Sequence, residues 1–279
     1  SPVLIKNYLP TMNRSEIFLV MVSGMGTIAG SVMGTYIGML GGTDPAAKVL
    51  FATHLLSASV MAVPGSIVLA KMLCPQTEEA TDHVAISGKE KENSNILDAI
   101  SSGTVTGVKL MTNIAAMLLV FISLVALANY ITEGVIGRYT GLNDWIVKIT
   151  DGKAQGLTFQ FILGVITSPF MWLIGVPSQD IMLVGSLLGQ KTILNEFVAY
   201  FQLQQWKDAG LFMYEKSILM STYILCGFAN ISSIGILLGG LGVLAPEKRG
   251  LISRIGVPAM IGGALVSVLS ATIIGMILG

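Results

Sequence analysis

The sequence predicts an all-α integral membrane protein that contains a re-entrant helical hairpin and two broken transmembrane helices. Three observations lead to this fold class: an apolar composition, two short apolar arms that meet at a polar tip, and two spans that break at matching places. Of the 279 residues, 53% are hydrophobic and 11% are charged, whereas a soluble domain carries about 25% charged residues. The mean hydropathy of +0.75 therefore favours a chain covered largely by lipid.

Charge and cysteine usage exclude several function classes. The formal net charge is zero, so nothing in the composition indicates a nucleic-acid partner. Cys74 and Cys226 lie far apart among apolar residues, and His54 and His83 do not complete a metal-ligand spacing. We therefore expect neither a disulfide framework nor a cofactor.

The first part of the chain is expected to hold two transmembrane helices over residues 14–74, since a span needs about 20 apolar residues. The first of them is expected to break near 24–31, where glycines and hydroxyl residues crowd together. Each glycine costs a helix interior up to about 1 kcal/mol relative to alanine. Residues 1–13 lack a signal-peptide pattern, and the chain starts at Ser1, so we expect it to begin inside a longer protein.

The middle of the chain is more polar. Mixed charges predict an aqueous loop over 75–98, followed over 99–131 by an amphipathic segment and a scaffold transmembrane helix. Residues 132–176 are expected to form an interfacial or external segment and then an apolar helix. A basic cluster near the C-terminus indicates a cytoplasmic side, and it comprises Lys248, Arg249 and Arg254. The 75–98 loop is then cytoplasmic if residues 177–206 return to their own side, and external if they cross.

Residues 177–206 predict a re-entrant hairpin. Two apolar arms of roughly 10–15 residues flank the polar pair Asn195-Glu196, and each arm reaches only about 15–22 Å as a helix. That length is too short for a hydrocarbon core of about 30 Å. Such backbone is tolerated at membrane depth where protein or a water-filled cavity covers it.

An internal repeat links the two ends of the chain. Residues 215–279 are expected to form two further transmembrane helices, the first broken near 227–233. At an offset of 203 residues, Gly24–Gly30 lies over Gly227–Ser233. Inverted repeats with breaks in matching places are typical of secondary transporters whose site lies near the midplane. The fold class is therefore that of an inverted-repeat transporter.

Polar side chains at the hairpin tip and in the breaks are the candidate site residues. Glu196 is costly inside a bilayer, which favours a role as acceptor for a polar substrate or as a cation site, although it also suits a helix N-terminus. Asn230 and Ser233 offer amide and hydroxyl groups for sugar hydroxyls, or else join packed helices. Thr27 and Ile28 lie in the first break, where freed carbonyls and a hydroxyl suit sodium, or where small residues simply pack closely.

At these residues the sequence resembles the concentrative nucleoside transporters over its whole length. The matching motifs are Gly26-Thr27-Ile28-Ala29-Gly30-Ser31-Val32, Ser59-Val60-Met61-Ala62-Val63-Pro64 with Lys71 and Pro75, Leu194-Asn195-Glu196-Phe197-Val198-Ala199-Tyr200, and the run from Leu225 to Ile236. The resemblance implies an ion-driven importer of nucleosides, a homotrimer with one site per protomer and an elevator-like movement. It also implies a multi-pass protein of the bacterial inner (cytoplasmic) membrane.

The resemblance implies roles for individual residues as well. Glu196 would bind ribose together with Asn230 and Ser233. Phe228 would line the rest of the site, and Val32 would contact the base. Thr27 and Ile28 would help to hold sodium, whose remaining ligands would lie upstream of Ser1.

The chain departs from the family at its front. Members carry a first hairpin with a Gly-Gln-Thr/Ser-Glu tip just before the residues that match Ser1-Pro2, and residues 1–13 would be its second arm. We therefore expect the C-terminal two-thirds of a transporter, which alone would not transport. Sodium or proton coupling, and purine or pyrimidine preference, stay open.

Three other classes of protein compete with a nucleoside symporter. A membrane enzyme would use Glu196 as acid or base, but no nucleophile–base pair or metal cluster accompanies it. A transporter of another small polar solute would use the same groups. A passive channel would need rings of like charge or a filter repeat, which the sequence lacks.

Overall fold

The computed structural model describes residues 8–78, 95–150, 152 and 154–279, and these form helices joined by turns. The chain divides into two compact units, residues 1–83 with 160–279 and residues 84–159. The helices of the first unit are α1 Arg14–Gly26, α2 Gly30–Gly41, α3 Pro45–Leu73, α7 Phe159–Leu173, α8 Ile181–Ile193, α9 Glu196–Asp208, α10 Glu215–Leu225, α11 Ile231–Leu244, η3 Pro246–Lys248 and α12 Arg249–Ile277. The helical prediction is therefore confirmed for the described residues.

The second unit is built on one long helix. The helices are α4 Ile96–Asn129, the π-helix η2 Tyr130–Gly137, α5 Arg138–Thr140 and α6 Leu142–Ile149. The Asn143 side chain links η2 to the segment after α6. It donates to the Glu133 carbonyl at 3.0 Å and accepts from the Leu157 amide at 2.9 Å. No proline interrupts α4, so one helix covers both the expected amphipathic segment and most of the expected span.

Two predictions fall outside the described residues. Most of the expected hairpin arm at 1–13 lies in residues 1–7, and most of the expected loop at 75–98 lies in residues 79–94.

Among the described residues, three helical stretches are long and apolar enough to cross a membrane: Arg14–Gly41, Pro45–Leu73 and Pro246–Ile277. The first consists of α1 and α2 together. Shorter apolar helices lie at Phe159–Leu173, Ile181–Ile193 and Ile231–Gly242. Two of these short helices, Ile181–Ile193 and Ile231–Gly242, adjoin the site described below.

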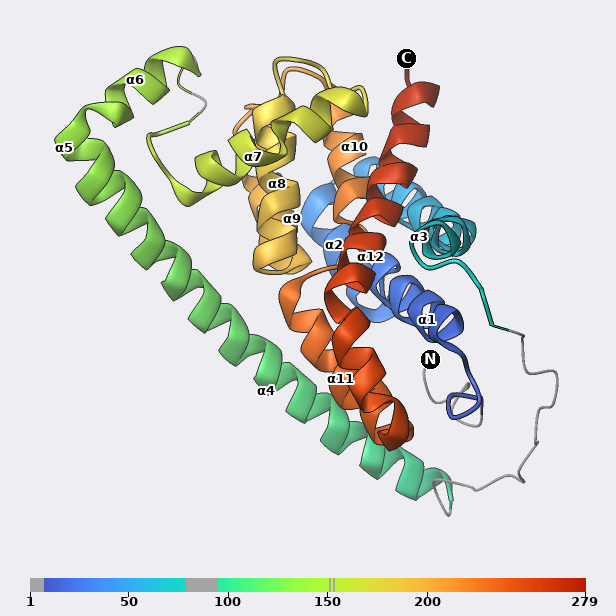
Figure 1. The fold of residues 1–279 in the computed structure, drawn as a ribbon. Coiled ribbons are helices and arrows are strands. Elements are labelled where there is room, and N and C mark those ends of the chain that lie inside the picture. Colours follow the sequence, from blue (N-terminus) through green and yellow to red (C-terminus); the bar gives the residue numbers. More distant parts are fainter. Residues whose placement is uncertain (1–7, 79–94, 151, 153) are drawn as a thin grey trace. The chain divides into compact units, whose positions relative to one another are not determined.

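Helix α12 is the shared packing partner of the first unit. It contacts α1, α3, α10 and α11 (Figure 1). Glycines permit these close approaches: a Cβ on Gly263 would lie 2.7 Å from Met25 Cβ, and a Cβ on Gly256 would lie 2.6 Å from Ile234 Cγ2. A side chain at either position would therefore push α12 away from its neighbours.

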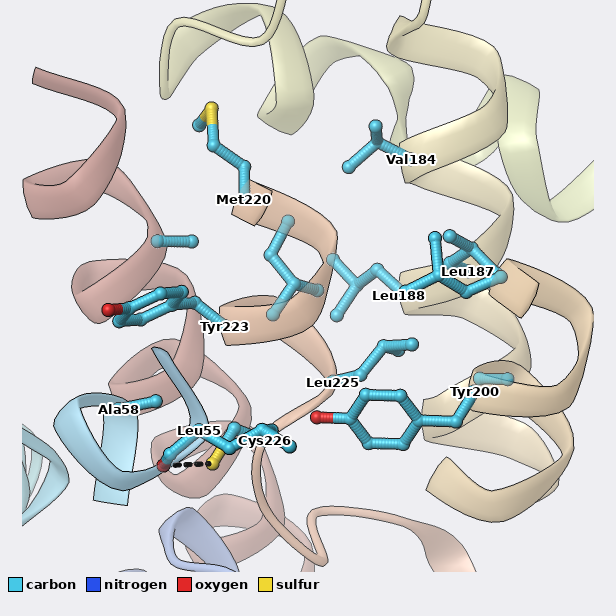
Figure 2. Packing of buried hydrophobic residues seen from close by; sticks show 14 of the residues in the cluster. Leu55, Ala58, Val184, Leu187, Leu188, Tyr200, Met220, Tyr223, Leu225 and Cys226 are labelled. Carbon is cyan, nitrogen blue, oxygen red and sulfur yellow. Dashed lines mark hydrogen bonds between the residues drawn. The ribbon is translucent and has the colours of Figure 1, made fainter. Parts of the chain in front are cut away.

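One apolar core of the first unit lies where α8, α9 and α10 meet α2 and α3, and another lies among α1, α3, α11 and α12. Figure 2 shows Leu188 of α8 directed toward α10, with Leu187, Leu225 and Tyr200 nearby. These four side chains are at most 9% exposed. This apolar packing surrounds the polar tip of the α8–α9 pair and fixes its position relative to α10.

Candidate functional site

The two breaks meet each other at the centre of the first unit. Helix α1 ends at Gly26 and α2 begins at Gly30, while α10 ends at Leu225 and α11 begins at Ile231. Gly227 has φ 136°, and a Cβ there would lie 2.9 Å from the carbonyl oxygens of both Met25 and Gly26. The second break therefore touches the end of α1, where the first break begins, at a place where only glycine fits.

The tip between α8 and α9 carries a buried carboxylate. Asn195 caps α9 by accepting from the Val198 amide at 2.9 Å, which places Glu196 in the first turn. Glu196 is 6% exposed, and its Oε2 accepts from Asn230 Nδ2 at 3.0 Å. Its Oε1 accepts from the Tyr36 hydroxyl at 3.4 Å. A negative charge is favourable at a helix N-terminus, which helps this carboxylate to stay buried.

Asn230 joins this carboxylate to the second break. As the N-cap of α11, its Oδ1 accepts from the Ser233 amide and Ser233 Oγ, both at 2.9 Å, and from Ser232 Oγ at 2.7 Å. The amide nitrogen is left to point at Glu196. One side chain thus ends the break, begins α11 and orients the carboxylate of the other helix pair.

The other predicted site residues surround this centre without a hydrogen bond to Glu196 in the described part of the chain. Phe228 and Val32 are half-buried and pack against the core of the first unit. Thr27 donates from Oγ1 to the Ser23 carbonyl at 2.9 Å, and Ile28 is buried. The described residues contain no cluster of three His, Cys, Asp or Glu.

Two polar residues beside the site were missed in the sequence. Tyr36, four residues after Val32 on α2, stacks on Tyr200 with ring centroids 4.1 Å apart and hydrogen-bonds Glu196. The i,i+4 spacing from Val32 was the available signal. Lys191 lies inside the first apolar arm and is fully buried. A lone cation in an apolar helix was itself a signal.

Chemically, the centre offers one carboxylate, one amide and the hydroxyls of Tyr36, Ser232 and Ser233. The carboxylate is a strong acceptor, while Asn230 and Ser233 supply donors and acceptors within the same small volume. Such a group suits a small molecule with several neighbouring hydroxyls.

A family profile described as "Na+ dependent nucleoside transporter C-terminus" matches residues 54–275. The chain belongs to the concentrative nucleoside transporter family. Its relatives in this family are transporters rather than enzymes, which removes the membrane-enzyme alternative.

Curated relatives and solved structures agree with this membership. The chain is 38% identical to sodium/nucleoside cotransporter 1 of Rattus norvegicus, covering 99% of this chain and 42% of the relative. It is 37% identical to nucleoside permease NupC of Helicobacter pylori, covering 100% and 62%. Against CNTnw in an inward-facing substrate-bound state the identity is 36% and the TM-score 0.82, covering 98% and 60%. The chain thus spans less than two thirds of these proteins.

Proposed function

We propose that the full-length protein is a cation-coupled secondary active importer of nucleosides in the cell inner membrane. The observation that carries the proposal is the hydrogen bond between Glu196 and Asn230, in a chain of this family. Glu196, Asn230 and Ser233 bind the ribose hydroxyls. Their burial and convergence from two helix N-termini support this role, because a polar ligand then replaces few solvent contacts.

The rest of the nucleoside lies against apolar side chains. Phe228 lines the site, where its ring can stack on the base, and Val32 contacts the base. Their partial exposure beside the buried core supports this, since a residue that receives a ligand is not fully covered before the ligand arrives.

The movement that carries the ligand is elevator-like alternating access. Helices α8 and α9 have 13 residues each, or about 20 Å, and so form a re-entrant hairpin rather than two spans. The hairpin and the two broken helices, one from each inverted repeat, move together, and the protein is a homotrimer. CNTnw has been solved in outward-facing and inward-facing states, which supports such a movement by analogy.

The coupling ion is sodium, with Thr27 and Ile28 among its ligands, and a proton is the alternative. Uridine uptake into proteoliposomes of the full-length protein tests ion and function together. Replacing sodium by choline should abolish concentrative uptake, whereas dependence on a pH gradient alone would assign the proton. Uptake indifferent to both gradients would contradict the symporter proposal, and absence of any nucleoside uptake would favour another small polar solute.

The role of Glu196 is tested by substitution. Glu196→Gln keeps the size but loses the charge, and should weaken uridine binding by about tenfold or more, because hydrogen bonds to a charged acceptor are the stronger ones. Isothermal titration of the purified full-length protein measures this. Glu215→Gln, at the exposed start of α10, is the matched control. An affinity equal to that of the wild type would remove Glu196 from the site.

A further inference from the structure

A lysine lies fully buried five residues before the site carboxylate. Lys191 in α8 has 0% of its side chain exposed. Its ammonium donates to the Ile224 carbonyl at 2.8 Å and to Ser267 Oγ at 3.0 Å. In the described part of the chain, no carboxylate lies within salt-bridge distance of it. A buried cation in an apolar helix is costly and marks a functional role by default.

The ammonium holds the broken end of α10. Ile224 lies in the last turn of this helix, where backbone carbonyls lose their helical partners and the helix dipole is negative. Ser267 of α12, which accepts from Lys191, donates in turn to the Cys226 carbonyl at 2.8 Å. Lys191 therefore connects the α8 arm, the second break and α12 at one point.

The buried lysine and the site carboxylate belong to the same pair of helices, α8 and α9. Glu196 is also buried, and its hydrogen-bonding partners Tyr36 and Asn230 are neutral. Lys191 lies in the last turn of α8 and Glu196 in the first turn of α9, so the two buried groups flank the same helix tip. Three further titratable groups interact with one or the other of these two residues, and all three are neutral in their ordinary forms: Tyr36, Tyr200 and Cys226. One positive and one negative charge are thus enclosed together.

We infer that Lys191 is a positioning residue of the site: a built-in cation that balances Glu196 and holds the break of α10 in place. The group formed by Glu196, Asn230 and Ser233 then presents a carboxylate acceptor without a net charge, which suits a neutral, polyhydroxylated ligand. This role rests on the proposed function, because it assumes that Glu196 binds such a ligand.

A double-mutant cycle on the full-length protein tests the inference. Uridine binding is measured for the wild type, K191M, E196Q and K191M/E196Q, with K207M as control. Lys207 lies in α9 of the same helix pair and reaches Asp208 at 3.0 Å. K191M should weaken binding by about tenfold or more, because it leaves the carboxylate unbalanced. In the E196Q background the same change should cost less than about threefold, and K207M should bind as the wild type does.

Two outcomes of the binding cycle would overturn the inference. An unchanged affinity of K191M would show that the ammonium is dispensable, and losses that simply add would make Lys191 a structural support without a link to Glu196. Thermal unfolding of the same variants tests the inference even if K191M folds poorly. The double variant should have a higher unfolding midpoint than K191M alone, since both charges are gone. A double variant no more stable than K191M also overturns it. If the wild type binds no nucleoside, the proposed function fails while this stability comparison still tests the charge pair.

Discussion

At the residue scale, the carboxylate of Glu196 is kept in place by neutral donors on both oxygens. Asn230 reaches Oε2 and Tyr36 reaches Oε1. A buried carboxylate without such partners would be strongly unfavourable. Because the donors come from α2 and from the start of α11, each can be removed without deleting the carboxylate itself.

Asn230→Asp separates the two roles of this side chain, which are to cap α11 and to donate a hydrogen bond to Glu196. Aspartate still accepts from Ser232 and Ser233 and so still caps α11, but it opposes Glu196 with a second carboxylate at about the present contact distance. Uridine affinity at neutral pH should fall by more than about tenfold and recover in part at acid pH, as one carboxyl group takes up a proton. Ser232→Ala, which removes one bond to the same oxygen, should cost less than about threefold. Equal effects of the two variants would contradict this assignment.

Tyr36→Phe tests the other oxygen. The variant keeps the stack on Tyr200 but loses the long hydrogen bond of 3.4 Å to Glu196. A loss of about 0.5–1 kcal/mol is expected, which is about twofold to fivefold in uridine affinity. Tyr200→Phe is the comparison: its hydroxyl donates to the Thr222 carbonyl at 2.8 Å. It should lower the thermal stability instead, and the reverse pattern would be evidence against these roles.

At the element scale, each broken helix ends where its sequence stops supporting a helix. The first break covers only Thr27–Ala29, narrower than the expected 24–31, because α1 continues through Gly24 and Gly26. The second ends earlier than expected, since Asn230 caps α11 and draws Ser233 into the first turn. A capping side chain therefore sets the boundary more sharply than the glycine content does.

Gly227→Ala should disrupt the contact between the breaks. Alanine is strained at φ 136°, and its Cβ would meet two backbone carbonyl oxygens at 2.9 Å that cannot move aside easily. We expect about 1–3 kcal/mol of destabilisation, measured as a lower midpoint of thermal unfolding of the full-length protein. Gly239→Ala in α11, with no heavy atom within 4 Å of the added Cβ, should be neutral or stabilising. An undiminished midpoint for Gly227→Ala would mean that the breaks do not touch.

At the scale of the whole molecule, α12 connects the parts that form the site. It packs on α1 through Gly263, while Ser267, one turn later, binds the second break and Lys191. Both breaks thus depend on the same helix face. Within the first unit, the geometry of the site follows from how closely α12 can approach.

Gly263→Leu tests this dependence. Its Cβ would already lie 2.7 Å from Met25 Cβ, so a larger side chain must displace α12 or α1. Overpacking of this kind costs about 1–3 kcal/mol, and uridine affinity should fall along with the unfolding midpoint. Gly250→Leu, in the open first turn of α12, is the control and should change neither. A stable Gly263→Leu protein with normal binding would separate α12 from the site.

The sequence by itself determined the membrane class, the family and the residues at the tip and in the breaks. Those signals are local: apolar runs, helix-capping side chains, glycines and short motifs. Only the tertiary structure decided which of these residues meet. Tyr36 and Glu196 are 160 positions apart, and Asn230 and Glu196 are 34 apart. Such contacts, like the burial of Lys191 against Ile224, depend on how closely packed helices approach one another, which no periodicity within a single helix encodes.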